Sequence, residues 1–398
     1  MARVVIVGAS VAGVRTAQAL RMQGFAGAIT LIGEEPHHPY DKPPLSKEHL
    51  RPDAPHDPPA LVSAEELEQL AVDLHLGVRA TGLDPAARVL HTDAGEHTYD
   101  QLVIATGVVP RTLPGSGLAG VRTVRTADDA AFLRSQLTTT PRVTVIGAGF
   151  IGAEFASAAR ARGCQVTVVE AQQTPMAHLF GERVGARLAA LHEANGVALR
   201  TGARFERFVG DGHVEGVVLA DGEVVPADLV VVGIGATPAT DWLRGSGLPV
   251  DDGVACESDL SVVGHPEIFA AGDVARWPHP HYGEPIRIEH WTNANEHGAI
   301  VASAIAGGPA PRAQVPYVWS DQYGHRIQIV GLPSRGTPAY VTGDGPTDLV
   351  AVYADRAGST VGAVVVDDSR TFMKLRKAVT KRTAFADLDL PQTSPAPA

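Results

Sequence analysis

The sequence predicts an α/β fold with two Rossmann-like dinucleotide-binding domains and a C-terminal α+β domain. Three observations predict it: the length of the chain, a strand–turn–helix–strand pattern that occurs twice, and a change to closely spaced strands near residue 316. At 398 residues the chain exceeds the roughly 250–300 residues at which single cores stop growing. We therefore expect two or three domains.

The repeated pattern is a strand, a glycine turn, a helix and a second strand. Residues 3–7 are a β-branched run that meets a turn at Gly8, followed by AGVRTAQALRMQG with helical spacing and by the strand AITLIGEE. Residues 143–146 repeat the arrangement, with a turn at Gly147, the helical segment EFASAARARG and the strand CQVTVVEA. Two nucleotide-binding units are expected.

A second repeated feature indicates how the two units connect. YDQLVIATGVVPR and ADLVVVGIGATPA each form an apolar strand that ends in a glycine turn and a proline. The later IFAAGDVARW resembles a return to the first domain, so the second domain is expected to be inserted into the first. The predicted boundaries are 1–112 with 239–315, then 113–238, and 316–398 with PQTSPAPA as a short disordered tail.

Composition excludes some classes of function. The formal net charge of −11 argues against a nucleic-acid binder, which needs a basic face. The start MARVVIVGAS enters a strand at once, and no run of about 18 apolar residues follows, so neither a signal peptide nor a membrane span is expected. The two cysteines, Cys164 and Cys256, form no C-x-x-C pair and fit a reducing compartment. We expect a cytoplasmic protein.

The first glycine motif is GASVAG, which runs from Gly8 to Gly13 and has Ser10 where the usual motif has its second glycine. Such a turn leaves helix N–H groups free for a pyrophosphate. Glu34, about 20 residues further on, is placed to accept hydrogen bonds from a ribose. A glycine turn between a strand and a helix also occurs without any ligand, so Glu34 strengthens the prediction.

The second motif is GAGFIGAE, with Gly147, Gly149 and Gly152 all present and Glu170 about 18 residues later. A glutamate here would bond a free ribose 2′-OH and repel a 2′-phosphate, and the Gln172 that follows offers no arginine for that phosphate. The motif therefore predicts NADH in preference to NADPH. The alternative is that Glu170 merely ends a strand.

Several segments together resemble a known family. They are PYDKPPLSKEHL, the paired glycine motifs, LVIATG, VRTADDA, IFAAGDVA, IEHWTNANEHG and VWSDQYG. They resemble the FAD-dependent, NADH-using ferredoxin reductases of bacterial oxygenase systems, of the putidaredoxin and rhodocoxin reductase type, over nearly the whole chain. The resemblance implies a glutathione-reductase-like arrangement, in which a hydride passes from NADH to FAD and single electrons pass to a [2Fe–2S] or [3Fe–4S] ferredoxin. The ferredoxin would feed an oxygenase such as a cytochrome P450.

The glycine motifs and the resemblance together mark candidate cofactor residues. For FAD they are Gly8, Ser10, Ala12, Gly13, Glu34, Lys42, Lys47, Ala80, Thr106, Gly107, Arg125, Asp273 and Trp291. For NAD they are Gly147, Gly149, Ile151, Gly152, Glu170 and Gly235. By resemblance, Arg125 contacts the flavin, Asp273 the ribityl chain, and Trp291 lies beside the isoalloxazine. Without the resemblance, these would read as a surface arginine, a turn aspartate and a core tryptophan.

One position departs from the family pattern. Relatives usually carry an arginine where this chain has Lys42, and a lysine offers a phosphate a point charge in place of a two-pronged contact. The contact is expected to survive with altered geometry.

Lys47 and Glu154 are the expected catalytic pair. By resemblance the matching pair lies beside flavin N5, where an ammonium stabilises the negative charge of the reduced flavin and a carboxylate fixes that ammonium. The alternative is a surface lysine and a helical glutamate. PPLSK carries Ser46 and no cysteine, so a flavin-to-dithiol path is not expected, and electrons should leave the flavin directly. No metal site is expected, because the histidines lack a cysteine or carboxylate framework.

The segment SRTFMKLRKAVTKRT is a candidate docking site for the ferredoxin. It has six basic residues and no acidic one, which could attract an acidic partner. The docking candidates within it are Arg370, Lys374, Arg376 and Lys377. The equally weighted alternative is a solvated amphipathic helix whose Phe372, Leu375 and Val379 face the core.

Two other functions share the cofactor motifs. An NADH oxidase or another flavin-dependent NADH oxidoreductase would use oxygen or a small molecule as acceptor. A regulatory flavoprotein resembling apoptosis-inducing factor would act partly as an interaction protein that responds to NADH. Such regulators tend to have targeting segments and long insertions in the last domain, and neither is visible here.

Overall fold

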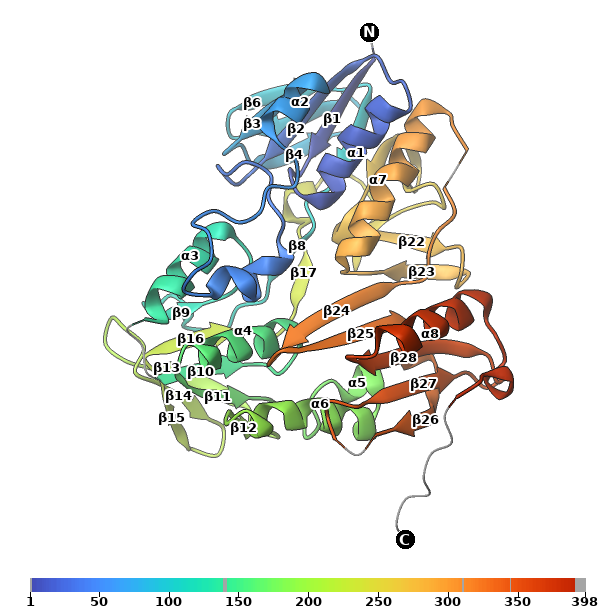
Figure 1. Ribbon diagram of the computed structural model, residues 1–398. Helices are drawn as coiled ribbons and strands as arrows, with labels where there is room; N and C mark the ends of the chain where they lie inside the picture. Colours follow the sequence, from blue (N-terminus) through green and yellow to red (C-terminus); the bar gives the residue numbers. More distant parts are fainter. Residues whose placement is uncertain (1, 139–141, 310, 344, 391–398) are drawn as a thin grey trace. The chain divides into compact units, whose positions relative to one another are not determined.

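The computed structural model describes residues 2–138, 142–309, 311–343 and 345–390 (Figure 1). The chain forms two compact units. Unit 1 comprises Met1–Pro43, Asp57–Val109 and Ala236–Gln314. Unit 2 comprises Pro44–His56, Pro110–Gly235 and Val315–Ala398. The three-domain boundaries drawn from the sequence stay a prediction beside this division, and the expected tail, residues 391–398, lies outside the described residues.

Unit 1 is built on a six-stranded sheet with strand order β20-β21-β7-β1-β2-β3. β1 is central and runs parallel to β2 and β7, and its residues Val4–Val7 are all buried, as expected for a parallel strand covered on both faces. The strands are β1 (Arg3–Val7), β2 (Ala28–Gly33), β3 (Val72–Leu76), β7 (Gln101–Ile104), β20 (Ser261–Val262) and β21 (His265–Ala270).

Helices α1 (Val11–Met22) and α7 (Trp291–Ala306) of unit 1 lie against each other (Figure 1). Gly298 makes this close approach possible, because a Cβ there would lie 2.7 Å from the backbone nitrogen of Thr16. The other helical elements of unit 1 are α2 (Ala64–Gln69), η3 (Asp241–Leu243) and η4 (Gly272–Val274).

Three small sheets complete unit 1. One contains β4 (Ala80–Asp84), β5 (Val89–Thr92) and β6 (Gly95–Thr98), and another contains β18 (Val250–Asp251), β19 (Gly253–Ala255), β22 (Ala275–His279) and β23 (Glu284–Arg287). The third pairs β8 (Val108–Pro110) with β17 (Ala236–Pro238), the strands at which the chain leaves unit 1 and re-enters it.

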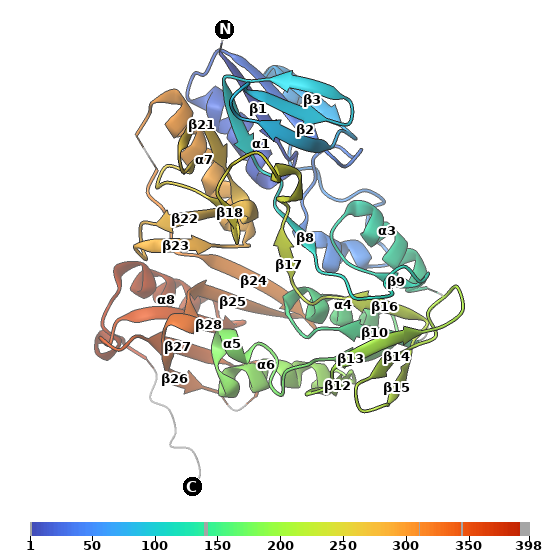
Figure 2. The same cartoon turned by 180° about the vertical axis from the view of Figure 1, so that it is seen from behind.

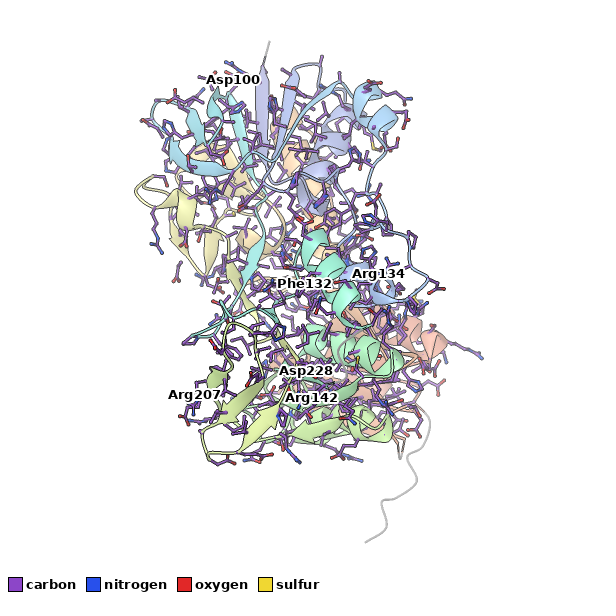
Figure 3. The ribbon with its side chains drawn as sticks, turned by 90° about the vertical axis from the view of Figure 1, so that its left-hand side faces the viewer. Asp100, Phe132, Arg134, Arg142, Arg207 and Asp228 are labelled. Carbon is purple, nitrogen blue, oxygen red and sulfur yellow. The ribbon has the colours of Figure 1, made fainter. Side chains whose placement is uncertain are left out.

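Unit 2 contains a five-stranded parallel sheet in the order β12-β11-β10-β16-β9. Arg142 starts β10, and its Nε donates to the Asp228 carboxylate before β16 at 3.0 Å; the two side chains lie together in Figure 3. This pair joins the ends of neighbouring strands. The strands are β9 (Val121–Arg122), β10 (Arg142–Ile146), β11 (Gln165–Val169), β12 (Ala198–Arg200) and β16 (Leu229–Val232).

Helices and a small antiparallel sheet surround this parallel sheet. α3 begins with a capping box, in which Thr126 and Asp129 each bond the other's backbone. The helical elements are η1 (Pro43–Ser46), η2 (Glu48–Leu50), α3 (Ala127–Gln136), α4 (Phe150–Ala161), α5 (Ala177–Phe180) and α6 (Glu182–Ala194). The small sheet contains β13 (Phe205–Val209), β14 (Gly216–Leu219) and β15 (Val224–Pro226).

The C-terminal part of unit 2 is an antiparallel sheet in the order β24-β25-β28-β27-β26 (Figure 2). Successive apolar side chains of this sheet point to opposite faces and belong to two cores. Val365 packs with Phe372 of α8 on one face, and Val364 packs with Leu188 of α6 on the other. The elements are β24 (Tyr317–Gln322), β25 (His325–Gly331), η5 (Pro333–Arg335), β26 (Thr337–Thr342), β27 (Val350–Ala354), β28 (Thr360–Val366), α8 (Ser369–Lys381) and η6 (Phe385–Asp387).

The parallel sheets confirm the predicted α/β class. Among the described residues, none of the helices combines the length and the apolar character needed to cross a lipid bilayer.

Candidate functional site

The first glycine turn lies in unit 1, between β1 and α1. Gly8 has φ +118°, and a Cβ on it would lie 2.2 Å from the carbonyl oxygen of Ala105. A Cβ on Gly13 would lie 2.0 Å from the carbonyl oxygen of Gly8. Only glycine fits at either position, because real Cβ atoms do not approach backbone oxygens so closely.

The N-terminus of α1 is open to an anion. Ser10 occupies the N-cap in an extended conformation and makes no capping hydrogen bond with its side chain. The first N–H that bonds back into the helix belongs to Val14. The N–H groups of Val11 to Gly13 therefore point out of the helix, as a pyrophosphate site requires.

The other FAD candidates of unit 1 lie on several different elements. Glu34 directly follows β2 and is exposed, and within the described residues it makes no hydrogen bond or ion pair. Ala12 lies close to Gly272 of the IFAAGDVARW segment, since a Cβ on Gly272 would lie 3.0 Å from the Cβ of Ala12. Ala80 starts β4 and is half-buried. Asp273, also half-buried, follows Gly272 in η4.

Three further candidates in unit 1 have partners within the protein. The Thr106 hydroxyl donates to the carbonyl of Ala239 at 2.9 Å, next to Gly107, whose carbonyl accepts from the N–H of Ala239. Trp291 opens α7 and donates from Nε1 to Asp41 at 2.7 Å. Lys42 donates to Glu35 at 2.7 Å and lies over the ring of Tyr40. Lys42 would therefore have to share its charge between Glu35 and a phosphate.

The second glycine turn lies in unit 2, between β10 and α4. Gly147 has φ +101°, and a Cβ on it would lie 2.3 Å from the carbonyl oxygen of Gly233. A Cβ on Gly152 would lie 2.1 Å from the carbonyl oxygen of Gly147. Gly149, the N-cap of α4, has open space where its Cβ would be, and the neighbouring Ile151 is 44% exposed. Packing does not require a glycine at 149, so a ligand that approaches the backbone there would explain it.

Glu170 closes this turn. Its carboxylate accepts the N–H of Ala148 at 2.9 Å and the N–H of Gln172 at 2.8 Å. These bonds hold the carboxylate beside the glycine loop, where a nucleotide ribose would lie. Gly235, with φ +92°, and Arg125 are also in unit 2; the N–H of Arg125 donates to Asp129 at the start of α3.

A buried ion pair forms the second centre of unit 2. Lys47 Nζ lies 3.2 Å from Glu154 Oε1 and 3.7 Å from Asp321 Oδ2, and it lies 5.5 Å from the centre of the Trp319 ring. The side chains of Lys47 and Glu154 are only 8% and 4% exposed. Burial raises the pKa of Glu154, and the nearby Lys47, Ser320 and Ser46 oppose that rise.

The sequence reasoning missed the residues that complete this cluster. Ser46 and Ser320 both donate to Glu154, and Asp321 and Trp319 contact Lys47. Three of the four lie in the WSDQ segment of β24, which contributes to the family resemblance but contains none of the predicted site residues. The available signal is the pair of polar residues at alternate positions of this strand, Ser320 and Gln322.

The segment that carries Lys47 is held by two arginines of unit 2. Arg134 of α3, labelled in Figure 3, donates to the carbonyls of Ala54 at 2.6 Å and Pro55 at 2.8 Å. Arg162 donates to the carbonyl of Leu50 at 3.0 Å. Arg162 thus satisfies the last carbonyl of the short η2, and Arg134 satisfies two carbonyls of the loop that follows it.

The described residues contain neither a reactive cysteine nor a cluster of metal-binding side chains. Cys164 lies in unit 2 and Cys256 in unit 1, and both are buried and unbridged. Burial raises the pKa of both thiols, that of Cys256 to about 12, so neither is an activated thiolate. Across residues 2–138, 142–309, 311–343 and 345–390, no group of three or more His, Cys, Asp or Glu side chains is arranged to hold a metal ion.

α8 presents a basic face to solvent. Arg370, Lys374 and Lys377 are exposed, and Met373, on the same face, is 58% exposed. Arg376 is half-buried and lies over the ring of Tyr317. The opposite face buries Phe372, Leu375 and Val379, so the helix is amphipathic and also keeps a basic surface.

Comparisons with known proteins place the whole chain. Residues 2–298 match the family described as pyridine nucleotide-disulphide oxidoreductase, and residues 317–395 match the family described as reductase C-terminal. The ferredoxin–NAD(+) reductase component of the biphenyl dioxygenase system of Paraburkholderia xenovorans is 36% identical, covering 96% of this chain and 94% of its own.

Two further similarities agree with this placement. Rhodocoxin reductase of Rhodococcus erythropolis is 35% identical, covering 97% of this chain and 93% of its own. The structure is also similar to the reductase in the covalent putidaredoxin reductase–putidaredoxin complex, with a TM-score of 0.92 and 31% identity over 96% of this chain and 94% of that one. The chain therefore belongs to the pyridine nucleotide-disulphide oxidoreductase family and, within it, to the ferredoxin reductases of oxygenase systems.

Proposed function

We infer that this chain is an FAD-dependent ferredoxin–NAD(+) reductase that supplies an oxygenase system. The observation that carries this inference is the combination of two nucleotide turns with the lack of a redox cysteine pair. Both cysteines are buried, unbridged and held as thiols, although the family is named for disulphide chemistry. Bound FAD would take a hydride from NADH and release electrons singly, which suits an iron–sulfur acceptor.

The residues of the first turn fit the pyrophosphate of FAD. Gly8 and Gly13 leave no room for a Cβ, and the N–H groups at the start of α1 are open. We assign FAD binding to this turn together with Glu34, Lys42, Ala80, Thr106, Gly107, Asp273 and Trp291 of unit 1. Arg125 stays a candidate by resemblance.

The residues of the second turn fit NADH. The open space at Gly149 and the uncapped start of α4 suit a pyrophosphate, and Glu170 suits a ribose with a free 2′-OH. A 2′-phosphate would meet the Glu170 carboxylate and be repelled. We therefore assign NADH as the preferred donor.

Lys47 and Glu154 are assigned to the reaction itself. A buried ammonium stabilises negative charge more strongly than an exposed one, because the local dielectric constant is low. Glu154 orients the Lys47 ammonium, and Asp321 provides a second carboxylate beside it. In this role Lys47 would act on the charge of the reduced cofactor, and Glu154 would hold the Lys47 ammonium in position.

The acceptor would dock on the basic face of α8. Arg370, Lys374, Arg376 and Lys377 provide positive charge in a chain of net charge −11, which would steer an acidic ferredoxin. The oxygenase beyond the ferredoxin would be a dioxygenase or a cytochrome P450. Cytoplasmic location stays a prediction.

An anaerobic experiment tests the function. The purified holoprotein is reduced with NADH and mixed with a panel of [2Fe–2S] and [3Fe–4S] ferredoxins while flavin and iron–sulfur absorbance are followed. Rapid transfer to a ferredoxin with slow oxygen consumption is expected. Rapid oxygen consumption without transfer to any ferredoxin would overturn the proposal in favour of an oxidase.

The docking face has its own test. The double variant K374E/K377E should raise the KM for the ferredoxin and flatten its dependence on salt, while the rate of reduction by NADH stays unchanged. Unchanged kinetics with the ferredoxin would exclude α8 as the docking site.

A further inference from the structure

Two serine hydroxyls bind the buried Glu154 carboxylate, one on each oxygen. Ser46 Oγ donates to Oε2 at 2.5 Å, and Ser320 Oγ donates to Oε1 at 2.7 Å. Lys47 Nζ lies 3.2 Å from Oε1. Ser46 and Ser320 are themselves buried, at 2% and 0% exposure, so water does not compete for these bonds.

The hydrogen bond from Ser320 has a defined direction. Gln322, two residues further along β24 and also buried, donates from Nε2 to Ser320 Oγ at 3.0 Å. Ser320 accepts this bond and is left to give its own proton to Glu154. One residue further, the N–H of Tyr323 donates to Ser157 of α4 at 2.7 Å, which holds the end of β24 against the helix that carries Glu154.

We propose that Ser46 and Ser320 are positioning residues that keep Glu154 ionised and aimed at Lys47. The physical reason is that an ionised carboxylate can only accept hydrogen bonds, and each of these serines has a proton to donate. The relevance of these serines to the reaction rests on the proposed role of Lys47. The protonation state of Glu154 can be measured whether or not Lys47 has that role.

Apart from Lys47, the charged groups around Glu154 give its ionised form little support. Of the elements that pack against α4, β24 contributes Asp321, whose negative charge opposes ionisation, and η2 carries Glu48 and the buried His49. Arg326 of β25 is occupied by Asp321 at 2.7 Å. β10 carries Arg142 at its exposed start, and β11 has no titratable side chain. Lys47 is the one cation in direct contact within the described residues, and Glu154 shares it with Asp321.

Infrared spectroscopy of the holoprotein as a function of pH tests the proposal. The carbonyl stretch of a protonated carboxylic acid is distinct from the carboxylate bands, and the part lost in E154Q belongs to Glu154. In S320A we expect Glu154 to take up its proton at a proton concentration roughly 10- to 100-fold lower than in the wild type, which corresponds to the loss of one charge-assisted hydrogen bond. S46A should act in the same direction through the other oxygen, and S320T should restore the wild-type titration.

S157A is the matched control, because it removes a hydroxyl on α4 that accepts from the N–H of Tyr323 in the same hairpin and, within the described residues, makes no hydrogen bond to Glu154. An unchanged Glu154 titration in both S320A and S46A, or an equal change in S157A, would overturn the proposal. The second readout is the rate of FAD reduction by NADH as a function of pH. The pH at which this rate changes should shift between variants in the same direction as the infrared titration of Glu154. If Glu154 titrates as expected but no ferredoxin is reduced, the network stands and the proposed function fails; the reverse result rejects the network alone.

Discussion

Replacement of Lys47 by methionine should destabilise the protein in a way that depends on pH. The change removes the ammonium from a pair in which both side chains are less than a tenth exposed. Methionine has a similar length and leaves no cavity, so the main effect is an uncompensated charge on Glu154. Removal of one partner from a buried pair costs about 3–5 kcal/mol.

The pH dependence follows from the pKa of Glu154. Burial raises this pKa, and Lys47 is the strongest influence that lowers it, so K47M raises it further. The folded K47M protein then holds a proton that the unfolded chain has released. Stability therefore falls as pH rises from the ordinary glutamate pKa of 4.5 through the raised value in the folded state. We expect a small loss at pH 5 and the full loss near pH 8.

Thermal unfolding with saturating FAD at pH 5 and pH 8 measures this difference. For folding units of 150–250 residues, each kcal/mol shifts Tm by about 2–4 °C, so the deficit at pH 8 should be roughly 6–20 °C. The double variant K47M/E154Q should recover most of it, because the buried charge is gone. K374M, at an exposed lysine, is the control and should change Tm little. A K47M deficit that is equal at both pH values, or that E154Q does not relieve, would refute the reasoning.

Three other predictions concern the nucleotide turns and the thiols. G149A should leave Tm nearly unchanged and raise the KM for NADH several-fold, whereas G152A should lower Tm, since its Cβ would lie 2.1 Å from the Gly147 carbonyl oxygen; thermal scans and steady-state kinetics separate the two. E170A should reduce the preference for NADH over NADPH, measured as the ratio of the two kcat/KM values, by about tenfold. An unchanged ratio would show that the Glu170 carboxylate only accepts the N–H groups of Ala148 and Gln172. C164A/C256A should transfer electrons to ferredoxin at the wild-type rate, and a loss of transfer without a loss of stability would show that a thiol takes part.

The local parts of the fold and of the site could be predicted from the sequence. β1 and β10 are short apolar runs that meet glycines, and the close approaches of Gly13 to Gly8 and of Gly152 to Gly147 join residues that lie near each other in the sequence. The position of Glu170 could also be predicted, because one helix and one strand of ordinary length set its sequence separation from Gly147. Such features depend on spacing that can be read along the chain.

The serines around Glu154 could not be predicted in this way. Ser46, Glu154 and Ser320 come from three distant parts of the sequence, and each is a polar residue with no period of its own. Residues 44–56 belong to unit 2 although the chain on either side belongs to unit 1, and this excursion depends on long-range contacts from Arg134 and Arg162. Local propensity carries no information about such contacts.

Helix α4 joins the two centres of unit 2. Its first turn offers free N–H groups beside Gly149, and Glu154 follows on the same helix less than two turns from its start. Because a helix is stiff along its axis, a nucleotide held at its N-terminus and a carboxylate on its body keep a constant separation. The partial positive charge of the N-terminus also favours the ionised form of Glu154, although this effect weakens beyond the first turn. The turn proposed to bind the nucleotide and the carboxylate that holds Lys47 are therefore positioned by one element, and a substitution that shifts α4 should affect NADH binding and the Lys47–Glu154 pair together.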